Sequence, residues 1–560
     1  MFINLYLYIF FYVFILFSTI GYGFLFLNLG NSLKKNIDLG YVGLFGIFFI
    51  LGYSYISNLF LAHGKLHNFI FLGIGIFLFI YFYFQKIKNL RNKILLVFLV
   101  FLVLFLASFI FKTHDDFPYY HFPYSYYLTQ TDLMIGIGQF NHGFRTPSSI
   151  FYINSLVYLP LINFNLIHMP SLMIMGFANI IFLIKINENF LLKKINFIGF
   201  YSLLAFIFVN IFFYRISEHG TDRSAQILIF LLILEVITFS NLNSELKQVA
   251  VGKLYILMAL IISLKAFYIL YLLLLLPFLY PELKKKNYLF LFNLLFKNLY
   301  FITFLIVVFF VLLNNFFNSG CFIYPVSITC VNSVIWSIPL TEVNQMNDWY
   351  EQWSKAGAGP NFRIDDPANY IQGFNWVSNW INEYFFTKVS DFLFGITTVS
   401  IILFITFYSK KKNTKTQYNL IFTYITLLIL FFEWFYNHPA LRYGGYTLIS
   451  LLIFIPIAQK LEKMENLFPK VKYKFICLIC LVFLIFEIRN INRISNEIKQ
   501  YNYKPLENVF YRINEDHYRI TNNMVELIKN YENCLTDKEN CKKDLNLKVK
   551  KNNGKYIFYR

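Results

Sequence analysis

The stretch ILLVFLVFLVLFLASFIF, residues 94–111, is almost entirely apolar, and KTHDDFPYYH, residues 112–121, follows it directly. An apolar run of this length is enough for one helix to cross a bilayer. Two histidines and two aspartates therefore lie beside a predicted membrane span: His114, Asp115, Asp116 and His121. Ionisable groups at a membrane edge are costly unless they stay wet, pair with opposite charges or bind a ligand. This segment is the first candidate for a functional site.

The composition assigns the whole chain to a class. Hydrophobic residues make up 58% of the 560 residues and charged residues only 14%, whereas an ordinary soluble domain is roughly 45–50% apolar. We predict an all-α polytopic membrane protein with about 12 to 14 transmembrane helices. Apolar windows of spanning length occur at 4–28, 39–62, 69–85, 94–111, 167–185, 197–214, 224–240, 299–317, 389–408, 418–436, 445–458 and 475–488. Residues 147–163 and 254–280 are ambiguous, and Lys265 interrupts the second of these stretches.

The basic residues predict which side each loop faces. They give a formal charge of +19 and gather in short clusters between the apolar runs, at 34–35, 86–93, 193–194, 284–286, 410–412 and 460–474. This placement is typical of cytoplasmic loops and argues against nucleic acid as a partner. The predicted outer loops are then 112–146, 215–223, 318–388 and 437–444. We predict a membrane domain over residues 1–488 and a small extracytoplasmic C-terminal domain over residues 489–560.

The cysteines agree with this assignment of sides. Cys321 and Cys330 lie in a predicted outer loop, and Cys534 and Cys541 lie in the tail. Pairs at short spacing predict two disulfides and an oxidising compartment. Cys477 and Cys480 lie within an apolar span without polar neighbours, which favours residues on a helix face over a metal or redox site.

Two outer segments carry acidic residues. Asp115 and Asp116 could supply a catalytic base or hold a divalent cation, Mg²⁺ or Mn²⁺, with His114 and His121 nearby. The alternative is a solvated loop whose tyrosines form an interfacial belt. The second segment, RISEHGTDRSAQ from residue 215, adds Glu218 and Asp222 as candidates.

Cations and tryptophans complete the candidate site. Arg442, in NHPALRYGGYTL from residue 437, can hold a phosphate group through paired hydrogen bonds, although snorkelling to lipid headgroups is the alternative. Lys265 within a span and Arg145 near the first acidic segment are further candidates for substrate binding. Five of the six tryptophans lie in loop 318–388. They favour either a surface that binds sugar rings or a set of interfacial anchors.

This order of elements resembles the GT-C class of membrane glycosyltransferases. It also resembles multi-pass proteins of bacterial surface-polysaccharide gene clusters, which share SG-x-x-x-YP, here Ser319, Gly320, Tyr324 and Pro325, and a late R-Y pair. The resemblance implies a donor sugar linked to a polyprenyl phosphate, Asp115 or Asp116 as base or metal ligand, and Arg442 on the donor phosphate. The sequence departs from the family pattern in placing four spans before the acidic loop.

We therefore expect a glycosyltransferase of the bacterial plasma membrane, with its active site on the extracytoplasmic face. It would transfer a sugar from the lipid-linked donor to a glycan or lipid-linked acceptor during assembly of the cell envelope. A polymerase or ligase of lipid-linked oligosaccharides is one alternative, and it would use the arginines without an acidic base. A transporter of lipid-linked glycans is another, with Lys265 on the transport path.

Overall fold

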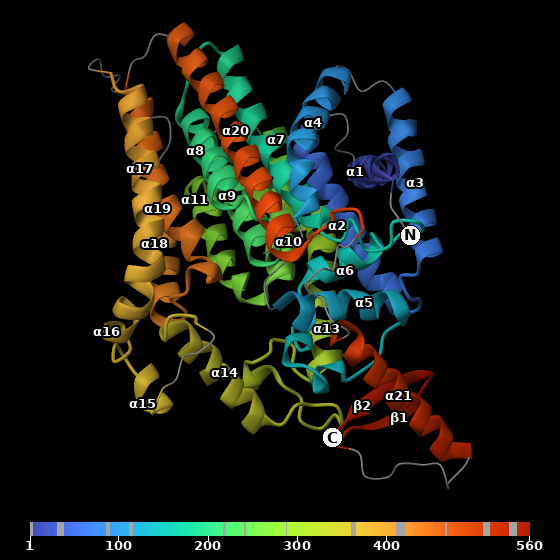
Figure 1. Ribbon diagram of the computed structural model, residues 1–560. Coiled ribbons are helices and arrows are strands. Elements are labelled where there is room, and N and C mark those ends of the chain that lie inside the picture. The colour runs from blue at the N-terminus through green and yellow to red at the C-terminus, as the bar shows by residue number, and fades with distance from the viewer. Residues whose placement is uncertain are drawn as a thin grey trace.

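The computed structural model is a bundle of long helices with smaller elements gathered at one end (Figure 1). The residues that it describes are 4–30, 38–85, 90–110, 116–216, 220–239, 242, 244–286, 288–359, 364, 366–409, 420–464, 468–507, 516–536 and 546–560. Within these residues, nine helical segments are long and apolar enough to cross a membrane, and three shorter apolar segments accompany them. This confirms the helical, membrane-protein character that the composition predicted.

The longer helices of the bundle follow the predicted windows closely. They are α1 (Leu5–Leu29), α2 (Leu39–Asn58), α3 (Lys65–Phe84), α4 (Leu90–Leu104), α7 (Met169–Leu191), α8 (Phe197–Phe212), α9 (Asp222–Phe239), α10 (Ser244–Leu264), α13 (Leu299–Ser319), α17 (Ser390–Phe407), α18 (Ile421–Asn437), α19 (Gly445–Glu462) and α20 (Phe468–Tyr501). Shorter helices are α5 (Phe122–Gln130), α6 (Ser149–Leu156), α11 (Leu275–Lys284), α12 (Tyr288–Phe296), α14 (Leu340–Lys355), α15 (Pro367–Ile371), α16 (Val377–Trp380) and α21 (Asp516–Thr536). Single turns and irregular helices are η1 (Leu106–Phe109), η2 (Phe117–His121), η3 (Ile137–Gln139), η4 (His142–Phe144), η5 (Ala266–Leu274), η6 (Ser327–Thr329), η7 (Ile381–Val389) and η8 (Leu441–Tyr443).

The structure shows which elements the two ambiguous stretches, 147–163 and 254–280, form. Residues 147–163 contain only the eight-residue helix α6, which is too short to span a bilayer. Residues 254–280 belong to three elements, α10, η5 and α11. Helix α10 ends at Leu264, and Lys265 has an extended backbone with φ −156° and ψ 115° before η5 begins and continues into α11. The lysine in the middle of the apolar run therefore marks a break between helices.

Helices α9 and α10 form a hairpin that is joined by two ion pairs. At the end that carries Asp222, Lys265 Nζ lies 2.8 Å from Asp222 Oδ1. Further along the hairpin, Lys253 Nζ lies 3.3 Å from Glu235 Oε1, and Tyr41 of α2 donates to the same oxygen at 2.5 Å. Each helix thus contributes one charge to each pair, which offsets the cost of placing charges in apolar helices.

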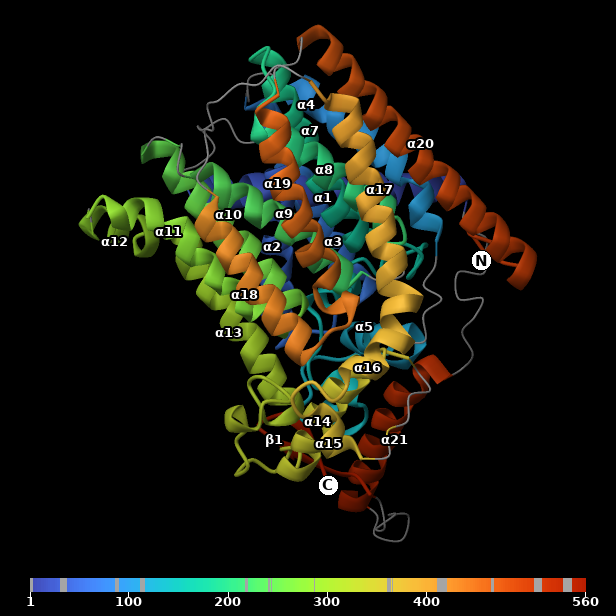
Figure 2. The ribbon, with the colours of Figure 1, turned by 90° about the vertical axis from the view of Figure 1, so that its left-hand side faces the viewer.

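The polar elements gather at the end of the bundle that carries Asp222, which we call the loop end. Helices α14, α15 and α16, together with α21 and the C-terminal strands, lie there in both views (Figures 1 and 2). The described part of segment 112–146 is folded there, with Tyr124 and Tyr127 buried. Its Tyr124 hydroxyl lies 3.0 Å from the Tyr152 hydroxyl and accepts from Asn318 Nδ2 at 3.1 Å. This rules out the alternative of a solvated loop for residues 116–146.

The C-terminal segment packs on the loop end as a helix and a hairpin. Strands β1 (Lys548–Asn552) and β2 (Lys555–Tyr559) pair antiparallel, with Val549 opposite Phe558. The boundary predicted at residue 488 falls inside α20, which continues as one helix to Tyr501.

Gly136 sits where segment 132–140 meets the C-terminal hairpin. Its φ is +78°, and a Cβ there would lie 2.1 Å from the carbonyl oxygen of Phe558. Gly136→Ala is therefore expected to destabilise the protein by roughly 1–3 kcal/mol, the cost of a strained backbone position. Thermal unfolding in detergent measures the change. Gly64→Ala is the matched control, because no atom lies within 4 Å of its Cβ position. Equal unfolding temperatures for the two variants would contradict the prediction.

Candidate functional site

Four of the predicted site residues meet at the loop end. Arg442 Nε lies 3.3 Å from Asp222 Oδ2, and Arg442 Nη2 lies 3.5 Å from Asp116 Oδ2. Lys265 joins them through its 2.8 Å ion pair with Asp222. We call Asp116, Asp222, Lys265 and Arg442 the charge cluster. Its members come from four segments far apart in the sequence, so the fold rather than local spacing brings them together.

Local structure explains where the two members on the α9–α10 hairpin lie. Asp222 is in the first turn of α9, where the helix dipole favours a negative charge. Lys265 follows the last residue of α10, where the chain leaves the helix. Gln226, one turn after Asp222, donates from Nε2 to the Arg442 carbonyl at 2.9 Å and accepts from Thr447 Oγ1 at 3.1 Å. This amide fixes the backbone of Arg442 relative to α9.

The loop before Arg442 is held by the tryptophan-rich segment 318–388. The Ala440 amide donates to Ser354 Oγ at 3.0 Å, and the Leu441 amide donates to the Tyr384 hydroxyl at 2.9 Å. Trp380 donates from its indole nitrogen to the Pro439 carbonyl at 3.2 Å. Segments 318–388 and 437–444, predicted separately, therefore form one supporting structure around Arg442.

Aromatic rings surround the two cations. The Arg442 guanidinium carbon lies 5.2 Å from the Trp353 ring centre and 5.4 Å from that of Tyr443. Lys265 Nζ lies 5.6 Å from the Tyr443 ring centre. The Arg442 and Lys265 side chains keep 31% and 28% of their surface exposed, whereas Asp222 keeps 10%. The cations are thus accessible to a ligand, and the buried acid lies behind them.

The surrounding charges set the electrostatics of Arg442. Burial on its own lowers the pKa of the guanidinium, but Asp222 foremost, followed by Tyr443 and Asp116, raises it by more. The pKa of Arg442 therefore lies above its ordinary value, and the group stays charged at any physiological pH. A permanently charged, forked donor is well suited to a phosphate group.

The five tryptophans of loop 318–388 do not share one role. Trp376 and Trp380 are buried, at 0% and 5% exposure, and stack edge to face at 6.1 Å. Trp336 is half-buried and donates to the Phe316 carbonyl at 3.0 Å. Trp349 is 40% exposed and lies 6.5 Å from Trp353. A sugar-binding surface made of all five is therefore wrong, and Trp336, Trp349 and Trp353 remain as candidates for that contact.

Arg145 is paired away from the charge cluster. It is 4% exposed, forms an ion pair with Glu342 and donates from Nη1 to the Tyr324 hydroxyl at 2.6 Å. Its Nε donates to the Gly138 carbonyl at 3.1 Å. Burial raises the pKa of the nearby Tyr350 hydroxyl, while Arg145 and Arg442 both lower it, so this tyrosine lies within electrostatic range of the two arginines. Arg145 supports the loop end, and its guanidinium is already occupied.

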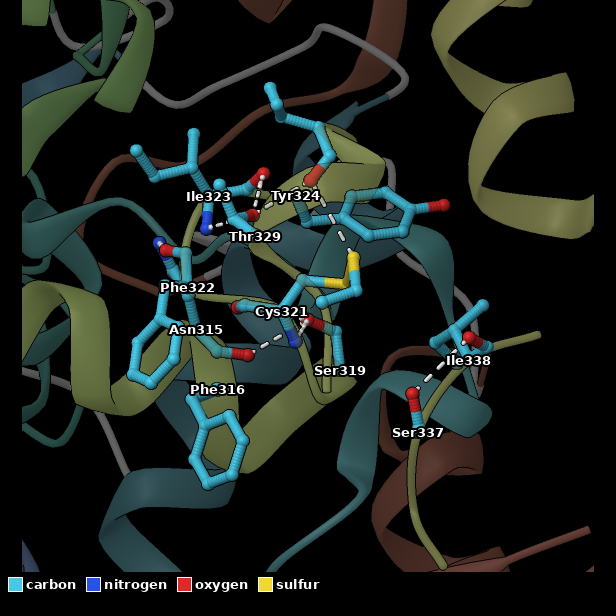
Figure 3. Close-up of a disulfide and its surroundings, with 12 residues drawn as sticks. Asn315, Phe316, Ser319, Cys321, Phe322, Ile323, Tyr324, Thr329, Ser337 and Ile338 are labelled. Carbon is cyan, nitrogen blue, oxygen red and sulfur yellow. Dashed lines mark hydrogen bonds between the residues drawn. A yellow bond between two sulfur atoms is a disulfide. The ribbon is translucent and has the colours of Figure 1, made fainter. Parts of the chain in front are cut away.

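The S-G-x-x-x-Y-P motif forms the turn that follows α13 (Figure 3). Cys321 and Cys330 are joined by a disulfide there. Ser319 Oγ donates to the Asn315 carbonyl at 2.8 Å and accepts from the Cys321 amide at 3.2 Å. Tyr324 of the motif receives the hydrogen bond from Arg145. The motif is thus a structural support of the loop end.

In the tail, Cys534 is disulfide-bonded, and Cys541 lies outside the described residues.

Histidines occupy the surroundings of the cluster. The His142 ring nitrogen Nδ1 lies 3.2 Å from the Tyr119 hydroxyl. Burial foremost, and then Arg145, lowers its pKa, which Asp116 partly offsets. Burial also lowers the pKa of His438, whose ring packs edge to face on Tyr443 at 6.0 Å. Both His142 and His438 are therefore neutral at pH 7.

His121 is 6% exposed and packs on Tyr120 and Phe151.

Three predicted site residues lie outside the described part of the chain: His114, Asp115 and Glu218. Within the described part, no group of three or more His, Cys, Asp or Glu side chains could hold a metal ion. Asp116, with its partner Arg442, is the described member of the predicted acidic pair. The predicted Mg²⁺ or Mn²⁺ remains a prediction.

Asp222 compensates the charges of both Lys265 and Arg442. Asp222→Asn is therefore expected to lower the free energy of unfolding by about 2 kcal/mol, the usual value of hydrogen bonds to charged groups in partly buried sites. Adding Lys265→Met should recover part of the loss, because the uncompensated ammonium is removed together with its partner. Chemical denaturation in detergent measures both variants. An additive, larger loss in the double variant would contradict this account.

Sequence reasoning overlooked several residues that support the cluster. Gln226 had a recognisable signal, since it is an amide one turn from Asp222 and directly before the apolar run of α9. Ser354, Tyr384 and Glu342 had none, because each is an ordinary residue of a polar or aromatic segment.

Comparison with known proteins identifies a family but no activity. Residues 5–449 match a family described as a domain of unknown function (DUF8201), and the chain belongs to this family. The match covers the charge cluster and ends within α19. No curated protein and no solved structure matches the chain.

Proposed function

We propose that this protein is a membrane glycosyltransferase of GT-C type. It transfers a sugar from a polyprenyl-phosphate-linked donor to an extracytoplasmic glycan or lipid-linked acceptor in cell-envelope assembly. The observation that carries the proposal is the charge cluster. Two half-exposed cations, Arg442 and Lys265, lie beside Asp116 and Asp222 at the edge of an apolar helix bundle. A lipid-linked phosphate needs cations at this place, where its prenyl chain can remain in the bilayer.

In the proposed reaction, an acceptor hydroxyl attacks the anomeric carbon of the donor sugar. The bond from that carbon to the phosphate oxygen breaks, and polyprenyl phosphate leaves. Asp116 or Asp115 takes the hydroxyl proton. If these two acids instead held a divalent cation, that ion would supply Lewis-acid activation of the hydroxyl. Arg442 and Lys265 stabilise the charge that develops on the leaving phosphate.

Asp222 has a different proposed role from Asp116. Because it is the most buried acid of the cluster and contacts both cations, it holds their side chains in place before the donor binds. A pre-positioned pair of cations avoids the cost of ordering two long side chains during the reaction. Asp222 is thus a positioning residue in this proposal.

The test is a transfer assay with the purified protein in lipid, with polyprenyl-phosphate sugars as donors and a glycan acceptor. The expected product is polyprenyl phosphate, released only when acceptor is present. Parallel reactions with EDTA separate the two proposed roles of the acids, because a metal-dependent reaction stops and a base-dependent one continues. Donor that binds and is never cleaved would favour the polymerase, ligase or transporter alternatives.

A further inference from the structure

We infer that the C-terminal hairpin holds helix α14 over the charge cluster, and that Arg560 and Glu342 are the positioning residues through which it acts. The consequence for sugar transfer rests on the proposed function. The contact itself does not, and it can be measured separately.

The hairpin is attached to the loop end by backbone pairing. The Ile135 amide donates to the Tyr556 carbonyl at 3.0 Å, and the Phe558 amide donates to the Ile135 carbonyl at 2.9 Å. The Phe558 side chain is fully buried and packs edge to face on Phe140 at 4.9 Å. Because a two-stranded hairpin is at best marginally stable by itself, β1 and β2 depend on this docking. Lys555 strengthens it by donating to the Leu59 carbonyl at 2.8 Å.

The pairing of the C-terminal hairpin with Ile135 places Arg560 next to the first turn of α14. Arg560 Nη1 lies 3.4 Å from Glu342 Oε2, and its Nη2 donates to the Gln139 carbonyl at 3.4 Å. The other oxygen of Glu342 pairs with the buried Arg145. One carboxylate therefore connects two arginines, one from segment 112–146 and one from the C-terminal segment.

We call the contact of Arg560 with Glu342 the clamp. Helix α14 connects the clamp to the charge cluster. Glu342 lies in its first turn, and Trp353 and Ser354 lie in its last turn, roughly 16 Å further along the axis. Trp353 stacks on Arg442, and Ser354 accepts the Ala440 amide. A helix fixed at both ends transmits a displacement at Glu342 to Trp353, and so to the side chain that contacts the phosphate in the proposed reaction.

The simpler alternative for Glu342 is that it stabilises the helix dipole, since an acidic residue in the first turn of a helix is favourable without any arginine. The two roles predict different results. If Glu342 acts only on the helix dipole, loss of Arg560 leaves α14 unchanged. If the clamp operates, loss of Arg560 loosens α14, and the effect disappears when Glu342 is already absent.

The experiment compares Arg560→Ala, Glu342→Gln and the double variant as full-length proteins in lipid nanodiscs. Hydrogen exchange of residues 340–355 is measured by mass spectrometry, together with KM and kcat for the lipid-linked donor. Arg560→Ala should speed exchange in α14 about 1.5- to 5-fold, the range for a half-exposed ion pair, and raise the donor KM by a similar factor. Arg560→Lys should restore part of both. Lys548→Ala, an exposed lysine on β1, is the control.

The double variant should match Glu342→Gln alone, because both substitutions break the same contact. Unchanged exchange in α14 in Arg560→Ala, or additive effects in the double variant, would overturn the inference. If the wild-type protein transfers no sugar, the proposed function fails, while the exchange measurement still decides whether the clamp exists.

Discussion

Arg442→Ala is expected to lower the rate of sugar transfer by roughly 10²- to 10³-fold, the effect of removing one donor from a preorganised charge-stabilising site. The guanidinium contacts Asp222 through Nε and Asp116 through Nη2, so its outward surface is oriented by two acids. The fold should survive the change, because Asp222 keeps Lys265 as its partner. Release of polyprenyl phosphate measures the effect.

Arg442→Lys should regain only a small part of the lost rate. A lysine is a single point charge and cannot contact both acids with the fixed fork of a guanidinium. Lys504→Ala is the control, since the exposed ion pair of Lys504 with Glu507, at 2.9 Å, is separate from the ion pairs of the charge cluster. Retention of more than half of the wild-type rate in Arg442→Ala would remove Arg442 from the proposed site.

Replacing both Asp115 and Asp116 by asparagine is expected to abolish transfer, with a loss of roughly 10²- to 10⁴-fold for removal of a general base. Expression and donor binding should persist, because Arg442 and Lys265 remain. The loss should therefore appear in kcat rather than in KM. Single variants show which of the two acids carries the role, and Asp391→Asn, an exposed acid at the start of α17, is the control.

Full activity in the Asp115/Asp116 double variant would exclude acid-dependent glycosyl transfer. Combined with an inactive Arg442→Ala variant, that result would favour a polymerase or ligase, which needs the cations and no acidic base. The two sets of variants thus separate the leading proposal from its nearest alternative.

Much of the charge cluster could be predicted from the sequence because charges are costly at a membrane edge. Asp116, Asp222, Lys265 and Arg442 each lie beside or within an apolar run, so each stands out. Their pairing could not be predicted, since it depends on how helices from distant segments pack. Arg145 was also a candidate, because it lies near the first acidic segment, but it is paired with Glu342 and does not join the charge cluster.

Other features of the structure could not be predicted from the sequence, for related reasons. A hydropathy window finds the part of a helix that crosses the bilayer and not its end, so α20 extends past residue 488 into a polar segment. Counting tryptophans cannot separate the buried Trp376 and Trp380 from the exposed Trp349. The contact of Arg560 with Glu342 joins two isolated charges more than two hundred residues apart, which no local pattern marks.

The two ion pairs of the α9–α10 hairpin limit how this protein can change shape. The pairs lie roughly 18–20 Å apart along the axis, and a slip of one helical turn is about 5.4 Å. Such a slip would break both pairs at once. Asp222 would keep its ion pair with Arg442, whereas Lys253, Lys265 and Glu235 would lose the partners that these pairs provide. The two ion pairs thus oppose sliding between α9 and α10 in both directions, and the hairpin is expected to move as one rigid unit. If the proposed function is correct, an opening that admits the lipid-linked donor is expected to come from other helices that move relative to this hairpin.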